Sequence, residues 1–98
     1  MRYGLEAITL PVSDVDRAKE FYAKAGWNLD VDTEPAPGMR VVQFTPPGSA
    51  CSIAFGTGIT EMAPGSVKGL TMVVADAQAA RDELIRRGAE VSEVEVLE

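Results

Sequence analysis

The chain has 98 residues, enough for one small domain with a thin hydrophobic core. Apolar residues make up 46% of it and charged residues 24%, as in globular proteins, which excludes disordered and low-complexity chains. Nine basic residues against fifteen acidic ones leave a net charge of −6, which opposes binding to nucleic acids and to anionic membranes. We therefore expect neither nucleic acid nor membrane as a partner.

The cysteine and histidine content narrows the possible chemistry. Cys51 is the single cysteine, so an internal disulfide and a multi-cysteine zinc site are excluded, and we expect a cytoplasmic protein. Histidine is absent, which removes the commonest metal ligand, the usual general base, and every Ser-His or Cys-His nucleophile pair. No stretch approaches the roughly 20 apolar residues of a membrane span.

The first elements in chain order are a strand and a helix. Residues 5–12 alternate between apolar and polar side chains, which predicts a strand. A helix is predicted over residues 14–25, because Ser13 and Asp16 match a capping box and Gly26 is a common helix terminator.

Three further strands are predicted to complete the first half of the chain. The second strand covers residues 27–33 and is ended by the Pro/Gly turn at 34–38. Two β-rich segments follow, at residues 39–45 and 51–55, and the turn at 46–50 is typical of a hairpin connection.

The second half of the chain starts in the same way as the first. Residues 69–75 predict a strand, Asp76 is a candidate cap for a second helix that ends at Gly88, and the alternating tail at 89–98 predicts a final strand. At an offset of 62, residues 8–14 align with residues 70–76, which indicates an internal repeat.

The repeat defines a β-α-β-β-β module. We expect a single domain over residues 1–98, in which module one covers 5–66 and a partial module two covers 67–98. A second module without its later strands leaves strand edges unpaired. We therefore expect the chain to pair with a second copy of itself, as a homodimer or higher assembly that exchanges strands.

Three features of the sequence carry a family resemblance: the Gly-Trp pair at 26–27, the recurrence at 69–88, and the segment at 7–22. That segment reads Ala-Ile-Thr-Leu-Pro-Val-Ser-Asp-Val-Asp-Arg-Ala-Lys-Glu-Phe-Tyr. The chain resembles the glyoxalase/bleomycin-resistance/extradiol-dioxygenase superfamily, also called vicinal oxygen chelate proteins. The resemblance implies an α+β fold in which tandem β-α-β-β-β modules form a curved mixed sheet, with helices on its outer face. The second module is expected to be incomplete, as in a shortened or engineered chain, with a naturally short protein as the alternative.

The resemblance also implies where metal ligands would lie in metal-dependent members. The two histidine positions fall on Ala7 and Gly69, and the carboxylate of the fourth strand falls near Ser52 or Ala54. These vacated positions offer a methyl group, a hydrogen and a hydroxyl in place of imidazole and carboxylate donors. We therefore expect no metal and no cofactor.

Candidate ligand contacts follow from the strand faces. We expect Phe21 and Tyr22 to dock the first helix on the sheet. The apolar strand residues expected to pack under the helices are Ile8, Leu70, Phe44 and Ile53. The polar residues that alternate with them along the strands would then face the other side of the sheet. These candidate pocket residues are Thr9, Gln43, Ser52 and Thr71, and the alternative is that they are ordinary half-exposed strand positions.

Two larger side chains are further candidates for the pocket. Trp27 would contact a ligand by stacking and Arg40 by pairing with an anion, with packing and solvent roles as the alternatives. Cys51 is expected to be structural, because no histidine is present to activate its thiol.

The sequence thus predicts a metal-free glyoxalase/bleomycin-resistance-like protein that binds a small organic molecule or is an orphan member without catalysis, so no catalytic residue is assigned. One alternative is a metal-dependent lyase, isomerase or dioxygenase of the same superfamily. The other is a truncated module whose main property is strand-swapped assembly.

Overall fold

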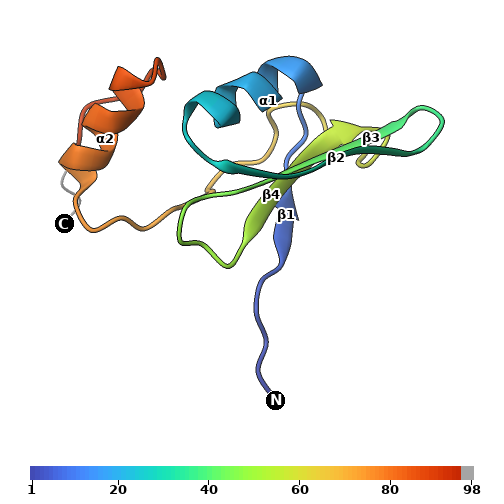
Figure 1. Ribbon diagram of the computed structural model, residues 1–98, viewed down its shortest axis with the longest axis horizontal. Helices are drawn as coiled ribbons and strands as arrows, with labels where there is room; N and C mark the ends of the chain where they lie inside the picture. Colours follow the sequence, from blue (N-terminus) through green and yellow to red (C-terminus); the bar gives the residue numbers. More distant parts are fainter. Residues whose placement is uncertain (96–98) are drawn as a thin grey trace.

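The computed structural model describes residues 1–95, and it has an α+β fold built on one curved, mixed four-stranded sheet. The strand order is β1-β4-β3-β2, with β1 parallel to β4 and the other neighbours antiparallel (Figure 1). The elements are β1 (Ala7–Thr9), α1 (Val15–Lys24), β2 (Asn28–Ala36), β3 (Met39–Thr45), β4 (Ser52–Thr57) and α2 (Ala77–Arg86). Within residues 1–95, neither helix is long and apolar enough to cross a membrane.

The core lies on one face of the two central strands. The register pairs Val42 with Phe55 and Phe44 with Ile53, so these four side chains share a face, and each is at most 3% exposed. The Phe44 and Phe55 rings stack with their centroids 6.1 Å apart. Burial of these side chains is the main source of stability for so small a domain.

Helix α1 covers this face of the sheet. Asp14 caps it, since its Oδ1 accepts a hydrogen bond of 3.0 Å from the backbone N–H of Arg17. The predicted capping box of Ser13 and Asp16 is therefore wrong by one residue. Gly26 follows the helix with a φ of 87°, the left-handed conformation expected of a terminating glycine.

Tyr22 is the residue that docks α1 on the sheet. Its ring centroid lies 5.8 Å from those of both Phe44 and Phe55, and 4.9 Å from that of Trp27. Phe21, which was predicted to dock the helix, is 49% exposed and makes only an edge contact with Tyr22. The prediction is confirmed for Tyr22 and wrong for Phe21, because residues 15, 18 and 22 form the apolar stripe at helical spacing and position 21 lies beside it.

Strand β2 extends past its predicted end, through the Pro/Gly-rich stretch to Ala36. It is an edge strand, so Pro35 can occupy it without leaving a neighbour unbonded, and the pairing with β3 is irregular between Thr33 and Ala36. The predicted bounds of β3 are confirmed. At the far end of β4, a Cβ on Gly56 would overlap the backbone carbonyl of Arg40, so the close approach of β3 and β4 requires glycine there.

The second half of the chain differs from its prediction. Residues 69–75 and 89–95 form no strand, and residues 96–98 of the predicted final strand lie outside the described part of the chain. Leu70, which was predicted to pack under a helix, is 43% exposed. The physical reason is that a strand needs a neighbouring strand for its backbone hydrogen bonds, and these segments have none beside them.

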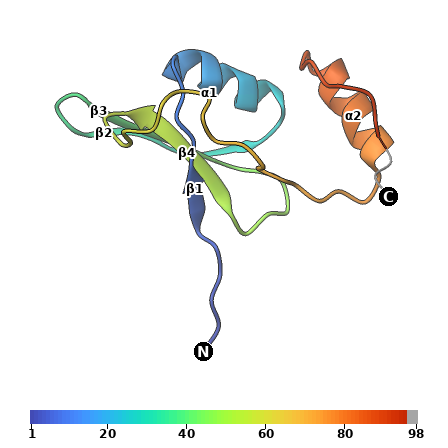
Figure 2. The same cartoon turned by 180° about the vertical axis from the view of Figure 1, so that it is seen from behind.

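Helix α2 forms as predicted but lies away from the sheet. Asp76 caps it by accepting a 3.0 Å hydrogen bond from the N–H of Ala79, and Gly88 follows with a φ of 95°. Figures 1 and 2 show α2 joined to the sheet by an extended segment and separated from the face that α1 covers. The expectation that both helices cover the outer face therefore holds for α1 and is wrong for α2.

An ion network joins α1 to β2 and β3. Arg40 donates to both carboxylate oxygens of Asp32, at 3.1 and 3.0 Å, and to Asp16 of α1 at 2.7 Å. Lys19 of α1 lies 2.7 Å from the same Asp32. The hydrogen bonds from Arg40 and then from Lys19 hold the pKa of the Asp32 carboxyl well below its usual range.

We expect Tyr22→Ala to lower the free energy of unfolding by about 3 kcal/mol, the lower end of the cost of removing a packed aromatic ring. Phe21→Ala is the matched control and should cost less than about 1 kcal/mol, because half of the ring is already in water. Denaturant unfolding of the two variants measures both values. A larger loss for Phe21→Ala than for Tyr22→Ala would show that the helix is rotated from the orientation described.

We expect Asp32→Asn to lower the free energy of unfolding at pH 7 by about 1 kcal/mol, as for a well-formed exposed ion network. Because folding depresses the pKa of Asp32, its contribution is present above the pKa of the unfolded chain, about 4, and is lost as the pH falls through the folded value. Glu20→Gln, which removes an exposed pair with Lys24, is the control and should change little. Equal effects of the two substitutions between pH 2 and pH 7 would contradict the network's role.

Candidate functional site

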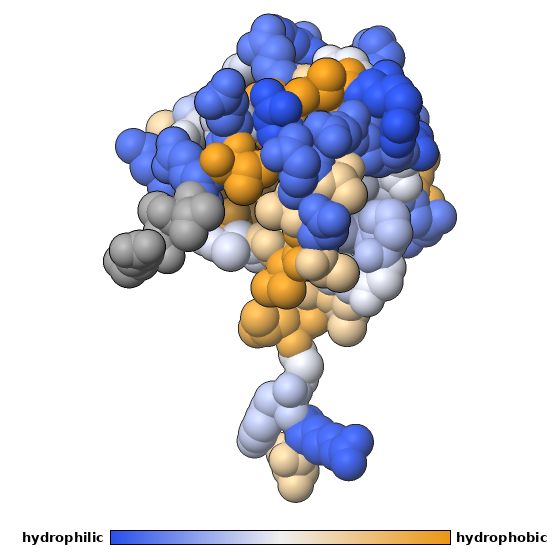
Figure 3. Space-filling model, turned by 90° about the vertical axis from the view of Figure 1, so that its left-hand side faces the viewer, coloured by the Kyte–Doolittle hydropathy of each residue, from blue (hydrophilic) through white to orange (hydrophobic). Residues whose placement is uncertain are grey.

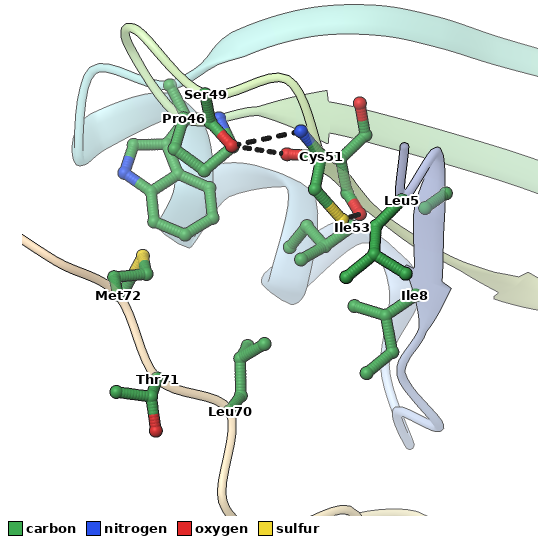
Figure 4. Close-up of a pocket in the computed structure, with 12 residues that line it drawn as sticks. Leu5, Ile8, Pro46, Ser49, Cys51, Ile53, Leu70, Thr71 and Met72 are labelled. Carbon is green, nitrogen blue, oxygen red and sulfur yellow. Dashed lines mark hydrogen bonds between the residues drawn. The ribbon is translucent and has the colours of Figure 1, made fainter. Parts of the chain in front are cut away.

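A cavity of about 360 Å³ lies at the end of the sheet where β1 and β4 begin. Figure 4 shows Leu5 and Ile8 on one side, Pro46, Ser49 and Cys51 above, and the segment from Leu70 to Met72 across the opening. Trp27, from the turn between α1 and β2, also lines it, as do Ala7, Ser52 and Ile53. The volume is in the range of small-molecule sites, roughly 300 to 1,000 Å³.

The wall of this cavity is mainly apolar and carries no charged side chain. Its polar side-chain groups are three hydroxyls and one thiol, from Ser49, Ser52, Thr71 and Cys51, and the indole N–H of Trp27. Ser49 donates to the backbone carbonyl of Cys51 at 2.8 Å and accepts from the Cys51 N–H at 3.1 Å, as drawn in Figure 4. These contacts fix the β3–β4 turn that forms the upper wall.

Three of the predicted pocket residues meet in this cavity: Trp27, Ser52 and Thr71. Thr9 and Gln43 do not line it, although they lie on the predicted face. The register pairs both of them with Ala54, so they share the open face of the sheet, opposite α1, with Ser52. The face was thus predicted correctly, but the cavity lies at its end and wraps around to the α1 side at Ile53.

The structure places Arg40 away from the other candidates. It lies at the start of β3, whereas the cavity begins beyond the end of that strand, at Pro46. Its guanidinium is held by Asp16 and Asp32 on the α1 side of the sheet. The predicted ligand contact of Arg40 is therefore replaced by a structural role in the ion network.

Sequence reasoning missed most of the cavity wall. Nine lining residues were not proposed as ligand contacts: Leu5, Ala7, Ile8, Pro46, Ser49, Cys51, Ile53, Leu70 and Met72. The sequence offered no signal for Leu70 and Met72, because they fall in a segment that was predicted to be a covered strand. The structure leaves them 43% and 54% exposed at the cavity opening.

The vacated metal positions do not form a metal site. Ala7 and Ser52 are direct partners in the β1–β4 register, but Gly69 lies in an extended segment with a φ of 85°. Ser52 Oγ lies 2.6 Å from Thr45 Oγ1, so its hydroxyl is already engaged. Within the described residues, no group of three or more His, Cys, Asp or Glu side chains could hold a metal ion. The donors present do not fit the metal of metal-dependent members.

Apolar side chains are exposed around the cavity. Figure 3, viewed from the α2 side, shows hydrophobic residues gathered above the N-terminal tail, and mostly hydrophilic residues with smaller hydrophobic patches over the upper surface. Leu5, Ile8, Leu70 and Met72 of the cavity wall are each at least 38% exposed, and Val73 beyond them is 95% exposed. Such a concentration is typical of a surface that binds a ligand or a partner.

Comparison with solved structures finds close agreement in fold. A glyoxalase/bleomycin resistance protein from Streptomyces sp. CB03234 is 32% identical, with a TM-score of 0.73 over 87% of this chain and 75% of that one. TnmS3, an antibiotic binding protein from Streptomyces sp. CB03234, is also 32% identical, with a TM-score of 0.74 over 89% of this chain and 72% of that one. A superfamily member from Sphaerobacter thermophilus DSM 20745 is 30% identical, with a TM-score of 0.74 over 89% and 73%.

A search of curated proteins found no match. The model of the Glyoxalase/Bleomycin resistance protein/Dioxygenase superfamily matches residues 4–96, which covers both halves of the internal repeat. The sequence resemblance and the similar structures agree with this match. The chain therefore belongs to the Glyoxalase/Bleomycin resistance protein/Dioxygenase superfamily.

Proposed function

We propose that this protein is a metal-free member of its superfamily that binds a small organic molecule in the cavity at the end of its sheet. The observation that carries the proposal is the cavity itself, about 360 Å³ in volume, with Trp27 and seven other apolar residues in its wall. The 32% identity with an antibiotic binding protein supports binding, and not conversion, of the ligand. A cytoplasmic location stays a prediction from the single cysteine.

The enzyme alternative is a metal-dependent lyase, isomerase or dioxygenase. Such chemistry needs several imidazole or carboxylate donors that converge on one ion. Ala7 and Gly69 supply none, and the hydroxyl of Ser52 is held by Thr45. The described residues therefore favour the binding protein over the metal-dependent enzyme.

The proposed assembly is a two-fold dimer formed along the free edge of β1. The N–H of Leu10 donates to β4 and the carbonyl of Glu6 accepts from it, so alternation directs the N–H groups of Ala7 and Thr9 to the other edge. That edge has no neighbouring strand within residues 1–95. A second copy bonded there would lie beside the cavity, since Ala7 is also part of its wall.

We expect calorimetry against a panel of natural-product antibiotics to detect binding, and we expect Ala7→Phe to lower the affinity about tenfold or more. The larger side chain fills the cavity from an exposed strand position. Ala36→Phe makes the same change at an exposed position of β2 outside the cavity and should keep full affinity.

Two further measurements on the same samples separate binding from catalysis. Chromatography with mass spectrometry should recover the ligand unchanged after long incubation, and elemental analysis after a mild chelator wash should find no stoichiometric metal. Chemical conversion of the ligand, or one retained equivalent of zinc, nickel, manganese or iron, would support the enzyme alternative instead.

We expect sedimentation equilibrium to show a dimer, and Thr9→Pro to shift it to the monomer. Proline removes the outward N–H of Thr9 but leaves the bonds between β1 and β4, which use the neighbouring residues. Thr9→Val keeps the N–H and is the control that should remain dimeric. A wild-type protein that sediments as a 10.4 kDa monomer at every concentration would rule out the proposed pairing.

A further inference from the structure

We infer that the molecule bound in the cavity is uncharged and mainly apolar, and that it donates hydrogen bonds to the hydroxyl groups of the cavity wall. This inference rests on the proposed function and names the class of ligand for the same site. It follows from the charges and the hydrogen atoms of the cavity wall.

No residue of the wall is Asp, Glu, Lys or Arg. An ionised ligand would leave water without gaining a partner of opposite charge, which is strongly unfavourable. The net charge of −6 adds a general repulsion for anions. The Arg40 guanidinium, which is the predicted anion partner, is held by Asp16 and Asp32 outside the cavity.

Two of the three wall hydroxyls already donate their hydrogen to backbone carbonyls. Ser49 donates to Cys51 O at 2.8 Å, and Thr71 donates to Gly69 O at 3.0 Å. The thiol of Cys51 points its hydrogen toward Ser52 O, 3.6 Å away. What these oxygens offer a ligand is a lone pair.

The neighbours of Ser52 determine where the hydrogen of this third hydroxyl points. Asp30 carries a carboxylate that only accepts, and Thr45 Oγ1 donates its one hydrogen to it. The bond of 2.6 Å between Thr45 Oγ1 and Ser52 Oγ must then use the hydrogen of Ser52. Ser52 therefore also presents only a lone pair to the cavity. A ligand gains most at the three hydroxyls by donating to them.

The test compares four probes that share one naphthalene ring. At pH 7, 2-naphthol is neutral with one donor, 2-naphthoate is an anion, 2-naphthylmethylammonium is a cation, and 2-methoxynaphthalene is neutral with an acceptor only. Calorimetry gives the affinity of each probe. The indole N–H resonance of Trp27, the one tryptophan of the chain, reports whether the probe is in the cavity.

We expect 2-naphthol to shift the Trp27 resonance and to bind about tenfold or more tightly than each of the other three probes. Tighter or equal binding of either ion would overturn the uncharged class, and equal binding of 2-methoxynaphthalene would overturn the requirement for a donor. In both cases the site still binds small molecules and the proposed function stands. If no probe binds or shifts Trp27, the proposed function itself fails.

Variants of the 70–72 segment test the same inference without disturbing the core. Met72→Asp places a carboxylate in the wall and should weaken 2-naphthol by about tenfold or more, whereas Val73→Asp, at the next residue and outside the wall, should not. Met72→Lys should reverse the preference and make 2-naphthoate the tighter probe. An unchanged order of probes in Met72→Lys would show that wall charge does not select the ligand.

Discussion

The packing of the Tyr22 ring against Phe44 and Phe55 is the contact on which the rest of the structure depends. It joins the only helix that covers the sheet, among the described residues, to the two strands that hold the core. The same tyrosine ring lies 4.9 Å from Trp27, so it also holds one wall of the cavity. Stability and the site are therefore coupled, because a change that loosens α1 also displaces Trp27.

The ion network of Arg40 and the cavity lie at opposite ends of β3. Arg40 stands near the start of this strand, in a network with Asp16, Asp32 and Lys19, whereas the cavity begins at Pro46 after its end. A strand of this length separates the two by roughly 20 Å, at about 3.4 Å per residue, beyond the Debye length at physiological salt. The charges of this network thus lie away from the cavity, whereas the Asp30 carboxylate is linked to Ser52 of the wall through Thr45.

The internal repeat shows how far local signals reach. Asp14 and Asp76 cap their helices in the same way, and Gly26 and Gly88 follow them with similar positive φ angles. The position of Tyr22, however, is taken by Leu84 in the second copy, and no strands lie beneath it. The same capping residues therefore form a helix in both copies, but only α1 has a sheet to pack on.

The sequence by itself determined the α+β class, the family, both helices, the bounds of β3 and the open face that carries Thr9, Gln43 and Ser52, because caps, glycines and alternation act over a few residues. Only the tertiary structure decided that Tyr22 and not Phe21 docks α1, that Arg40 pairs with acids instead of a ligand, and that residues 69–75 form no strand while Leu70, Thr71 and Met72 line the cavity. Each of these outcomes depends on which distant residues become neighbours, and a local pattern carries no information about them.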